Sequence, residues 1–132
     1  MSKFFKDKKF ILGDMQDEVR LNKITKNIDA AFHFAATADL YEANEKPFET
    51  IENNLSSTLK LLKALIKNKV KKIVFASSVY AISEQGGIYS TTKLASEMLI
   101  EKICKKYKIG FIILRFGTVY GGRANKFNTV NN

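Results

Sequence analysis

The sequence is poor in the residues on which several classes of protein depend. Its 132 residues include one cysteine, one proline, one histidine and no tryptophan. The single cysteine, Cys104, excludes a framework of disulfides within the chain and a zinc site built from cysteines. We expect Cys104 to lie on a helix as a packing residue. His33 lies in an apolar run, and we expect it to be a structural residue rather than a metal ligand.

Long apolar runs are also missing. No stretch approaches the roughly 20 apolar residues that a transmembrane helix needs. The first residues, Met1 to Asp7, carry charges but no apolar core of a signal peptide. We therefore expect a cytoplasmic protein with no membrane partner. An apolar content of 45% over 132 residues is typical of one globular domain.

Acidic residues are scarce in the second half of the chain. The sequence has 22 Lys and Arg against 13 Asp and Glu, a net charge of +9, and residues 67–132 hold only Glu84, Glu97 and Glu101 as acids. Such an asymmetry can indicate a nucleic-acid-binding face, and this stays an open alternative. Many of the lysines, however, follow two predicted helices, where cations complement the helix dipole. Because no aromatic residues alternate with them, we expect no nucleic-acid partner.

Short apolar runs alternate with longer periodic ones along the chain. The short runs predict strands at residues 10–13, 30–36, 73–77 and 111–116. Apolar residues at helical spacing predict helices over residues 19–28, 48–66 and 94–103, with Pro47 in the first turn of the second. Nearly continuous apolar strands separated by helices indicate an α/β fold, with a parallel sheet covered on both faces.

Polar residues follow several of these strands. Parallel sheets bind their ligands at the carboxyl ends of the strands. The polar residues at those ends are Asp14, Thr37, Ser77, Ser78 and Thr118.

The sharpest chemical signal is a tyrosine followed by a lysine four residues later. Tyr89 and Lys93 begin a predicted helix, and this spacing places them on one helix face. A nearby cation favours the phenolate, so we expect Lys93 to lower the pKa of Tyr89 and make it a general acid/base. Ser78, at the end of the preceding strand, could hydrogen-bond the substrate oxygen at which Tyr89 acts.

This arrangement resembles the short-chain dehydrogenase/reductase superfamily. Further segments are similar, in order, to its extended branch, the NAD-dependent epimerases and dehydratases that act on nucleotide sugars. The similar segments are Leu12–Met15, Phe32–Ala36, Asn53–Thr58, Lys72–Ser78 and Leu114–Gly121.

The resemblance implies a role for each matching residue. Ser78, Tyr89 and Lys93 would be catalytic, with Ser78 and Thr118 near the substrate and Tyr89 and Lys93 also touching the cofactor. Asp14 would contact the adenine ring, and small residues after the second predicted strand would let the backbone approach NAD. The remaining cofactor-binding residues would be Met15, Phe34, Ala35, Ala36, Asn54, Ser77 and Phe116.

Three features depart from the family pattern. No Gly-rich turn precedes residue 10, and the sequence ends where the family's substrate-binding part mostly begins. Tyr89 also follows Ser78 by only 11 positions. We therefore expect residues 1–132 to form a single partial NAD-binding domain, an internal fragment of a larger enzyme. It would be a partial Rossmann-type, doubly wound sheet of about four strands that lacks the family's first two. Residues 10–13 would then either pair with residues 30–36 or stay loose.

The function implied by the resemblance is an NAD-dependent epimerase/dehydratase-type oxidoreductase, with a nucleotide sugar as substrate. NADP stays open as the cofactor, and the full-length enzyme could be a homodimer. A non-catalytic dinucleotide-binding module and an inactive truncated fragment are the alternatives. We expect no metal site.

Overall fold

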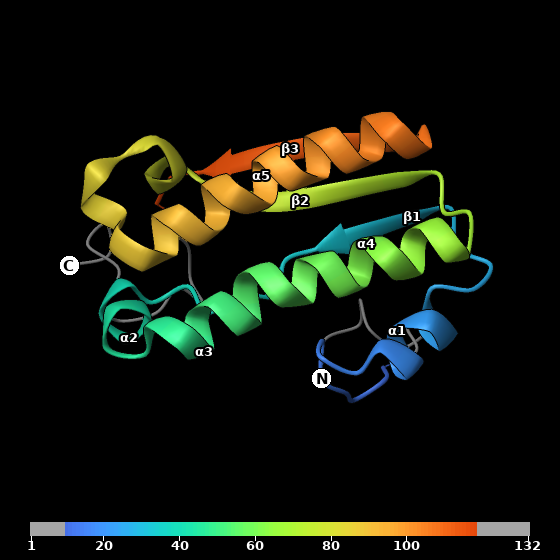
Figure 1. Ribbon diagram of the computed structural model, residues 1–132, viewed down its shortest axis with the longest axis horizontal. Coiled ribbons are helices and arrows are strands. Elements are labelled where there is room, and N and C mark those ends of the chain that lie inside the picture. The colour runs from blue at the N-terminus through green and yellow to red at the C-terminus, as the bar shows by residue number, and fades with distance from the viewer. Residues whose placement is uncertain (1–9, 119–132) are drawn as a thin grey trace, which may run out of the picture.

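A computed structural model describes residues 10–118 of the chain. Its centre is a parallel sheet of three strands, β1 (Ala30–His33), β2 (Lys72–Ser78) and β3 (Gly110–Phe116), in the order β1-β2-β3 (Figure 1). Phe32 pairs with Val74, and Ser78 pairs with Phe116. The three strands confirm the α/β class and three of the predicted strand positions.

Helices lie near the three predicted positions. The α-helices are α1 (Glu18–Ile24), α2 (Leu40–Glu45), α3 (Pro47–Ile51), α4 (Ser57–Lys67) and α5 (Gly87–Tyr107), with the short 3-10 helices η3 (Val79–Ile82) and η4 (Glu84–Gly86) before α5. Of these, α2 and the two 3-10 helices were not predicted. Asp17 and Asp39 begin α1 and α2, because their carboxylates accept hydrogen bonds from backbone amides of the first turn. Pro47 occupies the first turn of α3, as predicted.

The predicted helix over residues 48–66 has a wider turn within it. A π-helical segment, η2 (Glu52–Ser56), joins α3 to α4. The extra residue of a π turn changes which side chains face the sheet, and such turns occur often at functional sites. Here the segment contains the buried Asn54.

Helices α4 and α5 lie side by side over one face of the sheet, and α1 packs beside α4 (Figure 1). The buried core lies between these helices and that face. Its members are Leu21, Leu61, Leu62, Ala64, Leu65, Val70, Ile73, Phe75, Ile100, Cys104 and Ile109. Cys104 is thus a buried packing residue in α5, as predicted.

Two predictions about the sheet are wrong. Residues 10–13 form no strand and stay outside the sheet, which is the second of the two alternatives given for them, so the described sheet has three strands rather than about four. Ile11 is 49% exposed and Leu12 is 95% exposed, so little apolar surface is buried here. The described helices also cover one face only, because Phe32, Ile112 and Leu114 remain exposed on strands β1 and β3.

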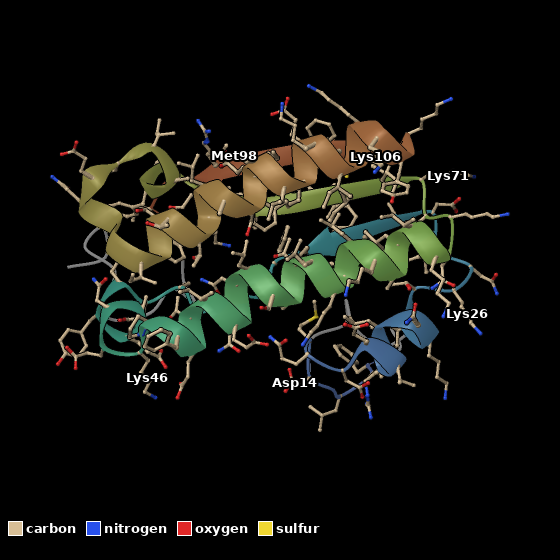
Figure 2. All side chains as sticks on the ribbon, in the orientation of Figure 1. Asp14, Lys26, Lys46, Lys71, Met98 and Lys106 are labelled. Atoms are coloured by element: carbon tan, nitrogen blue, oxygen red, sulfur yellow. The ribbon has the colours of Figure 1, made fainter. Side chains whose placement is uncertain are left out.

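Several lysines lie at the carboxyl ends of helices, as the sequence predicted. Lys67 is in the last turn of α4, and Lys105 and Lys106 are in the last turn of α5. Figure 2 shows Lys71 and Lys106 in the same half of the molecule, where α5 ends and β2 begins. Within residues 10–118, no helix has the length and apolar character needed to cross a membrane.

Candidate active site

The carboxyl end of β2 carries two buried serines. The backbone of Ser78 is extended, and its Oγ accepts a hydrogen bond from the amide of Tyr80, 3.2 Å away, which begins η3. The hydroxyl of Ser77 instead donates to the Glu97 carboxylate. Ser77 is therefore engaged within the protein, while Ser78 lies at the point where the strand ends.

Tyr89 and Lys93 lie one turn apart near the start of α5, as predicted. Tyr89 is 8% exposed and Lys93 is 4% exposed. The Lys93 ammonium donates to the carbonyl oxygen of Ala76 at 2.8 Å and lies 4.8 Å from the centre of the Phe75 ring. The ammonium thus packs against β2.

The electrostatics of this pair differ from the sequence prediction. Burial raises the pKa of Tyr89, because it penalises the phenolate, and a hydrogen bond with Ser78 opposes that rise. Burial lowers the pKa of Lys93 to about 8. The predicted lowering of the Tyr89 pKa by Lys93 is therefore wrong for this state of the protein. The ammonium is directed to the Ala76 carbonyl, and Nζ lies 5.7 Å from the centre of the phenol ring.

The predicted cofactor residues at the ends of the first two apolar segments come together. Asp14, Met15, Ala35 and Ala36 line one pocket of about 500 Å³. Its other lining residues are Leu12, Gly13, Gln16, Thr37 and Asn53. Figure 2 shows Asp14 at the surface, in the segment that leads into α1. Its Oδ1 accepts from the amide of Gln16 at 2.8 Å, which orients the carboxylate at the pocket.

Asn54 connects this pocket to α5. Its Nδ2 donates to the Thr37 carbonyl oxygen at 3.0 Å and to the Thr92 hydroxyl at 3.1 Å, and its Oδ1 accepts from the Thr37 amide at 2.8 Å. The side chain therefore ties the loop after β1 to the residue next to Lys93. Its partners in the structure are protein groups.

The other predicted residues lie at the strand ends. The rings of Phe34 and Phe116 meet edge to face, with their centres 6.2 Å apart, beyond β1 and at the end of β3. Both rings are exposed. Thr118 is exposed beyond β3.

His33, which we expected to be a structural residue, is buried. Thr58 donates its hydroxyl proton to the Asn54 carbonyl, so His33 Nε2 must donate to Thr58 Oγ1 at 2.8 Å. Burial, aided by the charge of Lys93, lowers the pKa of His33 to about 4. The ring is therefore neutral at neutral pH, and in residues 10–118 no three or more His, Cys, Asp or Glu side chains gather as a metal site.

Sequence reasoning missed one charge pair in this region, between the buried Glu97 and the exposed Arg115. Glu97 is 6% exposed and accepts two hydrogen bonds from the Arg115 guanidinium, from Nε at 3.0 Å and from Nη2 at 2.7 Å. Two signals could have found it. Glu97 continues the four-residue spacing of Tyr89 and Lys93, and Arg115 is a single charge in an apolar strand.

Comparison with known proteins gives a consistent result. A model of the NAD dependent epimerase/dehydratase family matches residues 2–131. The UDP-glucose 4-epimerase of Halalkalibacterium halodurans is 33% identical over 134 residues, which cover 90% of this chain and 40% of that protein. A UDP-N-acetylglucosamine 4,6-dehydratase (inverting) of Campylobacter jejuni is 29% identical over 89% of this chain and 36% of its own length. The chain thus spans about 40% of the length of the curated relatives that it matches.

Solved structures share the fold. The UDP-glucose 4-epimerase of Thermus thermophilus, solved with NAD, has a TM-score of 0.83 at 26% identity and covers 94% of this chain. This chain covers 45% of that structure. The UDP-N-acetylglucosamine 4-epimerase of Methanobrevibacter ruminantium, solved with UDP-N-acetylmuramic acid, has a TM-score of 0.81 at 27% identity, with coverages of 90% and 42%.

Proposed function

The chain belongs to the NAD dependent epimerase/dehydratase family, and on that premise we propose that the protein carrying it oxidises and reduces a nucleotide sugar. The observation that carries this proposal is the burial of Tyr89 and Lys93 beside Ser78 at the carboxyl end of β2. Parallel α/β sheets hold their ligands at this end. The names of the epimerase and dehydratase relatives supply the substrate class, a UDP-sugar.

In this proposal the phenol of Tyr89 moves a proton at one hydroxyl of the sugar. NAD, when bound, supplies the hydride acceptor and donor that such chemistry requires. Tyr89 takes the hydroxyl proton as the carbon becomes a carbonyl, and it returns the proton in the reverse step. Ser78 donates a hydrogen bond to the same oxygen, which stabilises the charge that develops there.

The directions of the two pKa shifts indicate the resting protonation state of this pair. Because burial raises the pKa of Tyr89, its phenol is protonated at neutral pH and is ready to act as an acid. To act as a base it needs a cation nearby. Lys93 Nζ lies 5.7 Å from the centre of the phenol ring and donates to the Ala76 carbonyl. An ammonium that leaves this carbonyl and moves to the phenol oxygen would favour the phenolate.

The pocket beside α1 fits the adenosine part of NAD. The small side chains of Ala35 and Ala36 leave about 500 Å³ open, and the Asp14 carboxylate lies at its edge as a hydrogen-bond acceptor. We propose that these residues hold the adenine end and that Tyr89 and Lys93 lie at the nicotinamide end. Phe34, Phe116 and Thr118 would flank the space between the strand ends.

A turnover assay tests the proposal. The intact protein that carries this sequence is incubated with NAD and either UDP-glucose or UDP-N-acetylglucosamine, and the products are identified by NMR. We expect turnover, and we expect Tyr89→Phe to lower kcat by about 10²–10⁴-fold. The matched control is Tyr107→Phe, which alters an exposed ring on the last turn of the same helix.

Two outcomes would contradict this function. Unchanged kcat in Tyr89→Phe excludes the assigned acid/base. Binding of NAD without turnover of any nucleotide sugar indicates a non-catalytic dinucleotide-binding module. A cytoplasmic location, the choice of NAD over NADP, and a homodimer of the intact protein stay predictions.

A further inference from the structure

Glu97 is a buried carboxylate to which the proposed chemistry assigns no role. It lies on α5 one turn beyond Lys93 and two turns beyond Tyr89, on the face that meets the sheet. Its Oε1 accepts from the Ser77 hydroxyl and from Arg115 Nε, and its Oε2 accepts from Arg115 Nη2. Hydrogen bonds from protein groups thus reach both carboxylate oxygens.

These contacts join three elements at one point. Ser77 and Arg115 are register partners on β2 and β3, and Glu97 binds both of them from α5. Lys93 adds a second link, because it donates to the carbonyl of Ala76, the residue before Ser77. Hydrogen bonds therefore join Ala76 and Ser77, near the end of β2, to Lys93 and Glu97 on successive turns of α5.

The hydrogen-bond partners of Glu97 stabilise its ionised form. Burial favours the neutral acid, but hydrogen bonds from Arg115 and Ser77 and the charge of Arg115 outweigh this effect and lower the pKa of Glu97. The side chain of Arg115 is 40% exposed, so solvent reaches the outer part of the pair. Glu97 is thus an ionised acceptor at neutral pH, well suited to hold the Ser77 hydroxyl.

We propose that Glu97 is a positioning residue that holds the end of β2 through Ser77, so that the neighbouring Ser78 hydroxyl stays against Tyr89. This inference rests on the proposed roles of Ser78 and Tyr89. Ser78 is the last residue of the strand and the cap of η3, so the ladder constrains it from one side only. The bond from Ser77 to Glu97 supplies the constraint that the ladder lacks.

The test measures the pKa of the Tyr89 phenol. The intact protein is labelled with 3-fluorotyrosine, and the fluorine signal lost in Tyr89→Phe identifies the residue. Its pKa is then measured by fluorine NMR titration. Because Ser78 lowers this pKa, Glu97→Ala should raise it by about half to one unit, the worth of one hydrogen bond.

The direction of the shift separates positioning from simple electrostatics. Loss of a negative charge would by itself favour the phenolate and lower the Tyr89 pKa. Ser78→Ala should raise the pKa as Glu97→Ala does, and the double variant should match Ser78→Ala alone. Glu97→Gln keeps an oxygen that can accept from Ser77, so it should restore most of the original pKa and also covers the case in which Glu97→Ala does not fold.

The matched control is Glu101→Ala, one turn further along α5. Glu101 pairs with Lys105 of the same helix rather than with Ser77 or Arg115, so its loss should leave the Tyr89 signal unchanged. Additive effects of Glu97→Ala and Ser78→Ala, a lowered pKa, or a loss of stability with an unchanged pKa would each overturn the proposal. The NMR readout needs no turnover, so a protein without sugar-nucleotide activity refutes the proposed function while this coupling is still measured.

Discussion

The ammonium of Lys93 donates a hydrogen bond to the carbonyl oxygen of Ala76, with 2.8 Å between the two atoms. This bond holds the charge of α5 against the backbone of β2, one residue before the paired serines. Because the amine is buried, its pKa falls from 10.5 to about 8. The relationship therefore links the stability of the fold to the protonation of a proposed catalytic residue.

Alkaline pH should stabilise the protein through Lys93. Between pH 8 and 10.5 the unfolded chain keeps the proton that the folded chain has lost, so the free energy of unfolding rises with pH in this window. The cost of burying the ammonium, of the order of 3 kcal/mol below that window, is removed across it. Urea denaturation at the two ends of the window measures the gain.

Lys93→Met should remove this gain, whereas Lys102→Met should retain it. Lys102 is exposed on the same helix. The comparison subtracts the titration of other groups, including Cys104, whose pKa burial raises. Equal pH dependence in the protein and in Lys93→Met would contradict the prediction.

His33 should stay neutral well below the usual histidine pKa. Burial and the charge of Lys93 lower its pKa from 6.5 to about 4. Since the unfolded chain binds a proton first, stability falls as the pH drops from 6.5 towards 4. His33 is the single histidine of the sequence, so its imidazole signal in a proton NMR titration is unambiguous. A midpoint near 6.5 would show that the ring is not buried as described.

Asn54→Ala should destabilise the protein by about 2–3 kcal/mol, because it removes one buried and two half-buried hydrogen bonds from their partners. These partners are the Thr37 amide, the Thr37 carbonyl and the Thr92 hydroxyl. The control is Asn53→Ala, which removes one exposed bond to the Thr37 hydroxyl. We expect it to cost less than about 1 kcal/mol by chemical denaturation. Equal costs would refute the importance of the Asn54 bonds.

Ala35→Leu should weaken binding of NAD to the intact protein by about tenfold or more, or roughly 1.4 kcal/mol. The larger side chain would enter the pocket that Ala35 lines with Asp14. Isothermal calorimetry measures the affinity, and Ala38→Leu is the control because Ala38 is exposed outside that lining. An unchanged affinity of Ala35→Leu for NAD would show that the adenine end does not bind in this pocket.

The sequence predicted the main elements because their patterns are local. Apolar runs marked β1, β2 and β3, and helical spacing marked α4 and α5. The serines that end β2 and the spacing of Tyr89 and Lys93 likewise placed three candidate residues together, namely Ser78, Tyr89 and Lys93. The run at residues 10–13 has the same composition as a strand yet forms none, because a strand also needs a neighbouring edge and packing on its faces.

The chemistry of individual residues depended on what lies opposite them. The sequence by itself determined the α/β class, the family and the side chains available at the end of β2. Only the tertiary structure decided that Lys93 turns to Ala76, that burial raises the Tyr89 pKa, and that Ser77 binds Glu97. A residue's type and spacing are written in the chain, whereas its solvation and its hydrogen-bond partners arise from contacts between segments far apart in sequence.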